Sequence, residues 1–398
     1  MAFEKGTTRN RKHTQGLTHF EANAAEGQHR KWFRGEHRKF APDLTRLTAA
    51  NAVERWVLDG WVPDAPMIDR DTKVTAFGSC FADHISSWLG GRNYRVSRED
   101  EKAQDTYVVR IGEGMVNTFV IRQQFEWAWE GKVFEEPLWH GYKAEDFGYD
   151  PEVQRATKEL FDTTDVFILT LGLSEIWYDE VTGGVFWRTI PRDVYDPKRH
   201  KFRVSTVEEN RDNLEAIYAL IRKHRPDAKV IFTLSPVPLV ASFRDVSCIS
   251  ANSVSKAVLR VAVDEFMRAH GEDEHAWYWP SYEIIMDVFG APFLNDRRHL
   301  ERPVLDFVMM QFEEVWCVDE GDRGNLAEQW VKAQAAAEKL PKRVGLAVGS
   351  RNRAAVARNA EALAKDADVR LGAARQKLLE EILDEWRRED AATSTAAE

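Results

Sequence analysis

The sequence predicts an α/β fold: a three-layer α/β/α sandwich with a mostly parallel sheet, followed by a helical C-terminal appendage. Short apolar runs alternate with amphipathic helical patterns through the middle of the chain, and that alternation favours parallel strands joined by helical crossovers. The chain has 398 residues, of which 43% are hydrophobic, so it can bury a core of the size that such a fold needs.

Four apolar runs are the expected strands. The first, VTAF at 74–77, is followed by a tight turn and a segment with apolar residues at helical spacing. The run at 165–172 is continuous and ends in glycine, which is typical of a central strand covered on both faces. Residues 229–236 and 276–281 give the later strands.

Two long helices are expected between the later strands. The first covers 205–226, opens with a capping box of Ser205 and Glu208, and ends before a proline. The second covers 253–270 and is amphipathic. Together with the strands they define an α/β domain at 70–320.

The two ends of the chain differ from this domain. Residues 1–45 are expected to form a basic, partly disordered arm, because 1–40 hold nine lysines and arginines against four glutamates. Cations interleaved with aromatic rings there also suit binding to phosphate or an acidic sugar chain. Residues 321–398 are expected to form a helical extension with a frayed tail, for self-association or for docking onto a biosynthetic partner.

Composition excludes several classes of protein. A net charge of -10 argues against general nucleic-acid binding. Cys80, Cys248 and Cys317 are odd in number and widely spaced, so they form neither a disulfide framework nor a zinc motif, and a cytoplasmic, reducing compartment is expected. No stretch approaches the roughly 18 apolar residues of a membrane span, and none is expected.

The turn after the first strand is the candidate for chemistry. Gly78, Ser79 and Cys80 stand at the carboxyl end of a strand, where parallel sheets gather their reactive groups. The first turn of a helix offers unpaired N–H groups and a positive dipole end, which stabilise a thiolate or an oxyanion. Cys80 is therefore a candidate nucleophile; the alternative is a small buried cysteine beside a glycine turn.

A second motif lies late in the same domain. Asp296 precedes His299 by three residues, a spacing that places a carboxylate behind an imidazole and orients it as a general base. The alternative is a solvated turn, because charged loops produce this pattern by chance.

These motifs resemble those of the GSCFA family, distant relatives of the SGNH (GDSL) hydrolases. The signature FGSCFA contains Gly78-Ser79-Cys80, TLGLSE follows in the middle, and Asp296-x-x-His299 comes late, within about 70–320. The resemblance implies an SGNH-like fold, with Cys80 at the position of the nucleophilic serine. Ser79 is then the fallback nucleophile or a contributor to the oxyanion site.

The sequence departs from the SGNH pattern in the middle block. Ser174 follows Gly172 by two residues and occupies the place of the asparagine that donates to the oxyanion. Asn117 is a substitute amide donor, or a turn or helix cap, and Gly114 offers a backbone N–H.

For Glu175 and for five tryptophans, a structural role and a functional role are both open. Glu175 is expected to be a structural acid paired with Arg122 or Lys256. Trp177 belongs to a group of five that suit stacking on sugar rings, although core packing is expected for most of them. The group is Trp127, Trp129, Trp139, Trp177 and Trp187.

The resulting hypothesis is an O-acyltransferase that acts on a glycan or glycolipid precursor through Cys80, His299 and Asp296. Acyl-CoA is the expected donor, because an acyl-cysteine is nearly isoenergetic with a thioester; no metal or other cofactor is required. An SGNH-type esterase or thioesterase is the first alternative. A non-catalytic carbohydrate-binding or scaffold module is the second.

Overall fold

A computed structural model of the chain describes most of the expected α/β domain. The described residues are 41–42, 44–111, 114–318, 323–337 and the single residues 384 and 388. Most of the expected basic arm, and of the expected C-terminal extension beyond 337, therefore lies outside the described residues. The contacts group the chain up to Ala337 into one unit and the remainder into another.

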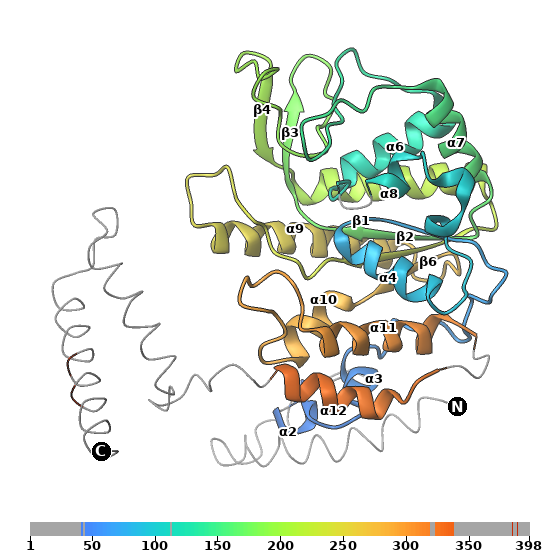
Figure 1. The fold of residues 1–398 in the computed structure, drawn as a ribbon, viewed down its shortest axis with the longest axis vertical. Helices are drawn as coiled ribbons and strands as arrows, with labels where there is room; N and C mark the ends of the chain where they lie inside the picture. Colours follow the sequence, from blue (N-terminus) through green and yellow to red (C-terminus); the bar gives the residue numbers. More distant parts are fainter. Residues whose placement is uncertain are drawn as a thin grey trace, which may run out of the picture. The chain divides into compact units, whose positions relative to one another are not determined.

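A parallel sheet lies at the centre of the first unit (Figure 1). In the described residues its order is β1-β2-β5-β6, and every pair is parallel. The strands are β1 (Val74–Gly78), β2 (Val166–Leu171), β5 (Lys229–Leu234) and β6 (Ala276–Trp279). The predicted parallel sheet is confirmed, and each predicted strand agrees to within two residues at either end.

The connection after β1 creates a switch in strand order. Val96 bridges in parallel to Val74 at one side of β1, whereas β2 pairs with the other side. The chain that follows β1 thus runs first along one side of this strand and then forms β2 on its other side. Ligands of open α/β sheets bind outside the carboxyl ends of the strands at such a switch point.

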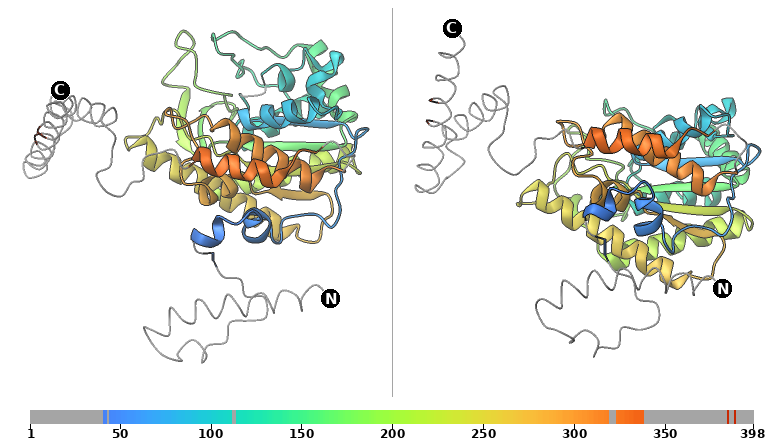
Figure 2. Two further views of the ribbon diagram at one scale, coloured as in Figure 1. Left: turned by 60° about the horizontal axis from the view of Figure 1, so that its bottom comes forward. Right: turned by 90° about the horizontal axis from the view of Figure 1, so that it is seen from below.

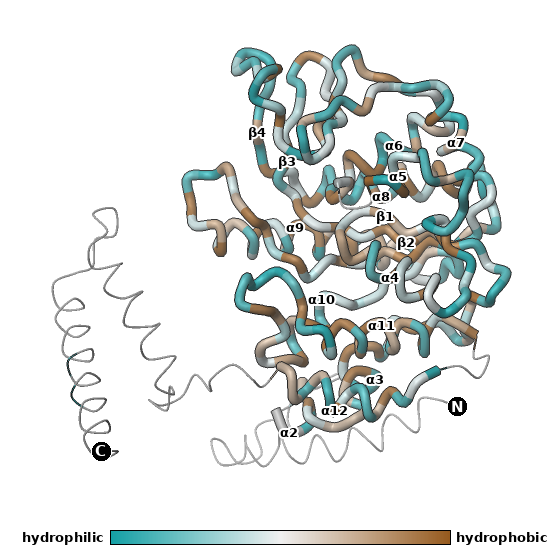
Figure 3. Tube along the Cα trace, viewed as in Figure 1, coloured by the Kyte–Doolittle hydropathy of each residue, from teal (hydrophilic) through white to brown (hydrophobic). Residues whose placement is uncertain are grey.

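Helices cover both faces of the sheet, which confirms the three-layer prediction. Alternate residues of β2 enter two different cores: Phe167 and Leu169 pack on one side, Val166 and Ile168 on the other. Figure 3 shows the hydrophobic stretches along these inner elements. The first face carries α6 (Thr118–Glu130), α7 (Pro151–Asp162), α8 (Val207–His224) and α9 (Cys248–Ala269), and the second carries α4 (Cys80–Gly90), α11 (Arg302–Trp316) and α12 (Leu326–Ala337).

The start of α8 corrects the predicted capping box. Thr206 and Glu209 form the reciprocal bonds, one residue later than predicted. The hydroxyl of Ser205 instead donates to the carbonyl of Ser174 at 2.8 Å. Helix α9 also begins five residues earlier than expected, at Cys248.

Two features were not expected from the sequence. An antiparallel ribbon of β3 (Glu175–Asp179) and β4 (His200–Val204) follows β2. The first part of the expected C-terminal extension, α12, packs beside α11 (Figure 2), with the ring of Trp330 5.1 Å from that of Phe307.

The remaining described elements are short, and no helix in the described ranges is long and apolar enough to cross a membrane. They are α2 (Leu44–Leu47), α3 (Ala52–Trp56), α5 (Tyr107–Arg110), α10 (Ser281–Glu283), the 3-10 helices η2 (Ser97–Glu99) and η3 (Glu101–Ala103), and the π-helical η4 (Ile284–Val288).

Candidate active site

The turn from β1 into α4 requires a glycine. Gly78 has φ of 131°, and a Cβ added there would lie 2.2 Å from the carbonyl oxygen of Thr170. The next N–H, that of Ser79, donates to Thr170 Oγ1 at 2.6 Å. These contacts fix the end of β1 against the end of β2 and aim the first turn of α4 at the switch point.

Ser79 is bound into the fold as the N-cap of α4. Its side chain accepts from the N–H of Phe81 at 3.2 Å and from Thr170 Oγ1 at 3.0 Å. Only 4% of the residue is exposed. The hydroxyl therefore serves the helix start, as an N-cap serine normally does.

Cys80, the first residue of α4, is half-buried and lines a cavity of about 410 Å³. This cavity brings together most of the residues that the sequence singled out, from segments far apart in the chain. The predicted residues that line it are Ser79, Cys80, Gly114, Asn117, Gly172, Glu175, Trp177 and Trp187.

Asn117 is both a helix cap and a lining residue. Its Oδ1 accepts from the N–H of Val120 at 3.0 Å, which makes it the N-cap of α6. That bond fixes the orientation of the amide, and Nδ2 has no hydrogen-bond partner within the described part of the chain. Cap and amide donor are thus compatible roles of this one side chain.

The backbone N–H groups of the two lining glycines are already used. Gly114 donates to the carbonyl of Ile111 at 2.9 Å, and Gly172 donates to that of Val116 at 2.7 Å. Gly114 was expected to donate its backbone N–H to the oxyanion. This N–H instead closes the turn from Ile111 to Gly114, so the expected role conflicts with the structure.

Sequence reasoning missed the role of Lys256, a buried lysine beneath the cavity. Its Nζ donates to the carbonyls of Gly172 and Ser235, both at 2.7 Å, and only 2% of the residue is exposed. Desolvation lowers the pKa of Lys256 to about 7, while attraction to Cys80 acts in the opposite direction. Lys256 therefore belongs to the electrostatic surroundings of Cys80.

Glu175 has a different partner from the two that were expected. Its Oε1 accepts from the hydroxyl of Ser242 at 2.9 Å. Arg122 instead pairs with Glu126 at 2.7 Å, and Lys256 binds carbonyl groups. The second oxygen of Glu175, Oε2, is buried without a hydrogen-bond partner.

Ser174 lies outside the cavity lining. It is fully buried, its N–H donates to Ser255 Oγ at 2.8 Å, and its own hydroxyl has no partner in the described part of the chain. Ser174 thus occupies the asparagine position of the SGNH pattern without presenting a group to the cavity.

Most of the singled-out tryptophans pack in the core, as expected. Trp127, Trp139 and Trp187 are at most 1% exposed, and Trp129 is 8% exposed. Trp177 is half-buried and lines the cavity.

The predicted pair of Asp296 and His299 is formed. His299 Nδ1 contacts the carboxylate of Asp296, and the hydrogen bond from His299 is the main reason that the pKa of Asp296 lies well below its usual range. The His299 side chain is 74% exposed. Its neighbour Arg298 lines the cavity, whereas His299 does not, so a contact between His299 and Cys80 stays a prediction.

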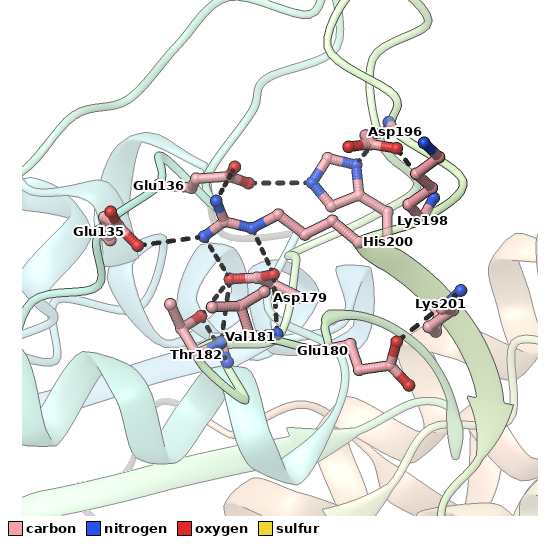
Figure 4. Close-up of polar contacts among 12 residues, drawn as sticks. Glu135, Glu136, Asp179, Glu180, Val181, Thr182, Asp196, Lys198, His200 and Lys201 are labelled. Atoms are coloured by element: carbon pink, nitrogen blue, oxygen red, sulfur yellow. Dashed lines mark hydrogen bonds and ion pairs between the residues drawn. The ribbon is translucent and has the colours of Figure 1, made fainter.

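A polar network anchors the ribbon that carries Trp177 (Figure 4). Arg199 pairs with Asp179 at 2.6 Å and with Glu136 at 2.7 Å. His200 reaches the same Glu136 through Nε2 at 2.9 Å. Because Asp179 is fully buried, this network holds the ribbon in one position, and with it one wall of the cavity.

No curated protein is significantly similar to the chain. Among solved structures it resembles an acetyl xylan esterase (Est2A) from the rumen bacterium Butyrivibrio proteoclasticus, with 13% identity and a TM-score of 0.21. The match covers 55% of this chain and 57% of the esterase, too distant a likeness to carry an argument. The GSCFA family profile matches residues 73–312, more than half of the chain and all of the elements that form the site. The chain therefore belongs to the GSCFA family.

Proposed function

We propose that this protein is an acyltransferase that carries the acyl group on Cys80 and delivers it to a hydroxyl of a glycan or glycolipid precursor. The observation that carries the proposal is the different placement of two neighbouring side chains at the start of α4. Ser79 is bound inside the fold, while Cys80 opens into the cavity at the switch point of the sheet. Acyl-CoA is the proposed donor.

In the first half-reaction the Cys80 sulfur forms a bond to the acyl carbon of the donor. Negative charge develops on the carbonyl oxygen, where Asn117 Nδ2 and the positive end of α4 stabilise it. The intermediate collapses when the bond to the donor sulfur breaks, and the released coenzyme A thiolate takes up a proton from solvent, which the proton of the acceptor hydroxyl replaces in the second half-reaction. An acyl-cysteine remains.

The second half-reaction regenerates the thiolate. A hydroxyl of the acceptor loses its proton to a general base as its oxygen bonds to the acyl carbon, and the bond to Cys80 breaks. We assign the base to His299, oriented by Asp296. Lys256 supports the thiolate through its positive charge when it is protonated.

An esterase or thioesterase is the closest alternative. The same residues perform hydrolysis when water replaces the acceptor hydroxyl. A thioester donor favours transfer, because the acyl-cysteine keeps enough free energy to acylate an alcohol.

The test is a partition experiment. The protein is incubated with acetyl-CoA, with and without mono- and oligosaccharides, and free CoA, acetate and acetylated sugar are measured by mass spectrometry. Acetylated sugar formed at the expense of acetate supports transfer. Acetate formed at one rate whatever sugar is added contradicts it and identifies a hydrolase. A parallel assay offers p-nitrophenyl acetate as the acyl donor. If neither this ester nor acetyl-CoA is consumed, the protein is a non-catalytic module.

A further inference from the structure

We propose that the cavity binds an acidic carbohydrate, a sugar unit bearing a carboxylate or phosphate group, through Arg188 and Arg298. The inference deepens the proposed function and rests on it for the identification of this sugar as the acceptor.

Both arginines lack a carboxylate partner among the described residues. Nε and Nη2 of Arg188, and Nε of Arg298, are buried without a hydrogen-bond partner, and neither side chain forms an ion pair with another described residue. Arg199, by contrast, contacts three carboxylates. A guanidinium that is partly removed from water and left unpaired costs free energy, which an anionic ligand offsets.

The charges that face the cavity are unbalanced. Its charged lining residues are Arg188, Arg298 and Glu175, and Lys256 lies beneath it. One carboxylate and the Cys80 thiolate of the proposed mechanism thus stand against two guanidinium groups and the buried amine of Lys256. A guanidinium presents several N–H donors in a plane, which suits the two oxygens of a carboxylate or phosphate.

Arg188 would hold the anion close to the segment that carries Asn117, the proposed oxyanion donor. A Cβ added to Gly114 would lie 3.4 Å from Arg188 Nη2, so the guanidinium rests against the segment that leads to Asn117. The face of Arg188 is covered by the Tyr142 ring, whose centroid is 3.7 Å from Cζ. Tyr142 is 73% exposed, so this pair stands at the mouth of the cavity.

The walls favour a sugar ring as the carrier of the anion. Three rings, those of Trp177, Phe202 and Phe243, lie with centroids 5.3–5.5 Å apart and all line the cavity. Flat apolar faces suit the C–H faces of a pyranose. Glu175 Oε2, buried and unpaired, is an acceptor for a sugar hydroxyl.

The test measures binding on full-length Cys80→Ala protein, which cannot be acylated. Calorimetric titrations use methyl glucuronide, glucose 6-phosphate, methyl glucoside and coenzyme A. We expect one of the two acidic sugars to bind on the order of 10- to 100-fold tighter than the neutral sugar, with an affinity that falls as salt rises. The preferred anion tells a carboxylate site from a phosphate site.

Three arginine variants in the same background locate the site. Arg188→Gln and Arg298→Gln are expected to remove the preference for the acidic sugar. The matched control is Arg203→Gln, since Arg203 also lies over aromatic rings but is paired with Glu209. Should a variant fail to fold, the comparison of acidic with neutral sugars on the parent protein decides alone.

Equal binding of acidic and neutral sugars, or an equal effect of the Arg203 control, overturns the inference. So does tight binding of coenzyme A with none of any sugar, which would place the arginines on the donor. Failure of the proposed function looks different: an acidic-sugar preference with no acyl transfer by the wild-type protein leaves the binding site standing.

Discussion

The starts of α4 and α9 are a natural comparison, because each helix begins with a cysteine that follows a serine. Cys80 follows Ser79, and Cys248 follows Ser247; both cysteines are half-buried at the first helical position. A helix start is a favourable position for a thiolate in general. Local sequence and secondary structure therefore do not separate the two.

Their surroundings do separate them. Ser79 caps its helix, whereas Ser247 makes no side-chain cap bond. Cys80 faces the cavity at the end of a parallel strand and interacts with Lys256, while Cys248 is outside the cavity lining and contacts the carbonyl of Leu239 at 3.7 Å. The carboxyl end of a parallel strand, the cavity and a buried lysine therefore distinguish Cys80 from Cys248, whereas a position at a helix start does not.

The largest expected effect separates the two cysteines directly. Cys80→Ala should lower acyl transfer on the order of 10⁴- to 10⁶-fold, because the nucleophile is lost. Cys248→Ala should keep wild-type turnover. Steady-state rates with acetyl-CoA check both, and a fully active Cys80→Ala protein would contradict the assignment.

The next effect concerns the general base. His299→Ala should reduce kcat by about 10²- to 10⁴-fold, the usual contribution of a positioned acid or base. Asp296→Asn should reproduce part of that loss, since it keeps the size of the orienting group and removes its charge. Wild-type kcat in both variants would remove this pair from the mechanism.

Lys256→Met should slow alkylation of Cys80 by iodoacetamide, on the order of 10²-fold, while that of Cys248 is unchanged. The two rates are read from the same sample by peptide mass spectrometry. Equal rates for Cys80 with and without Lys256 would show that the lysine only fills space.

Lys256 also predicts a pH dependence of stability. Its pKa is about 7 in the folded protein against an ordinary 10.5, so between these values the unfolded lysine binds a proton that the folded one has lost. The free energy of unfolding of the wild type should therefore rise with pH across that window relative to Lys256→Met. Denaturant unfolding at several pH values checks the sign.

Two substitutions of Asn117 distinguish its role as a helix cap from its proposed role in catalysis. Asn117→Ser keeps an oxygen for the N–H of Val120 and removes the amide donor, so kcat should fall by about 10²- to 10³-fold with stability nearly kept. Asn117→Ala should show the same fall in kcat and a further loss of about 1 kcal/mol in stability. An active Asn117→Ser protein would exclude the amide from the oxyanion site.

The smallest expected change in rate belongs to Ser79. Ser79→Ala removes the cap of α4 and the contact with Thr170, at a cost of about 0.5–2 kcal/mol in stability, and leaves the Cys80 nucleophile in place. Thermal unfolding and turnover measured together check this. A variant as impaired in turnover as Cys80→Ala, yet stably folded, would make the serine the nucleophile.

The sequence predicted the elements whose pattern is local. Each central strand is a continuous apolar run, and the Gly78 turn is marked by its glycine and the helical pattern after it. The cap of α8 was placed one residue early, because Ser205 and Thr206 are both followed three residues later by a glutamate. Local sequence does not tell which of these two residues caps the helix, because tertiary packing decides it.

The parts that were missed depend on contacts between distant segments. No local pattern assigns Lys256 to Gly172 and Ser235 or brings Arg188 to Gly114. Lys256 did carry a signal: it precedes Leu259 and Val263 by three and seven residues, which places it on the buried face of α9. A lysine on such a face is an early indication of a polar site beneath it.

The most direct test of the central claim is the site of acylation. Wild-type protein is quenched shortly after mixing with acetyl-CoA or p-nitrophenyl acetate, digested at low pH to preserve thioesters, and mapped by mass spectrometry. The account predicts an acetyl group on Cys80, with Cys248 and Ser79 unmodified in the same digest. An acetyl group on Ser79, or equal labelling of Cys80 and Cys248, would contradict it.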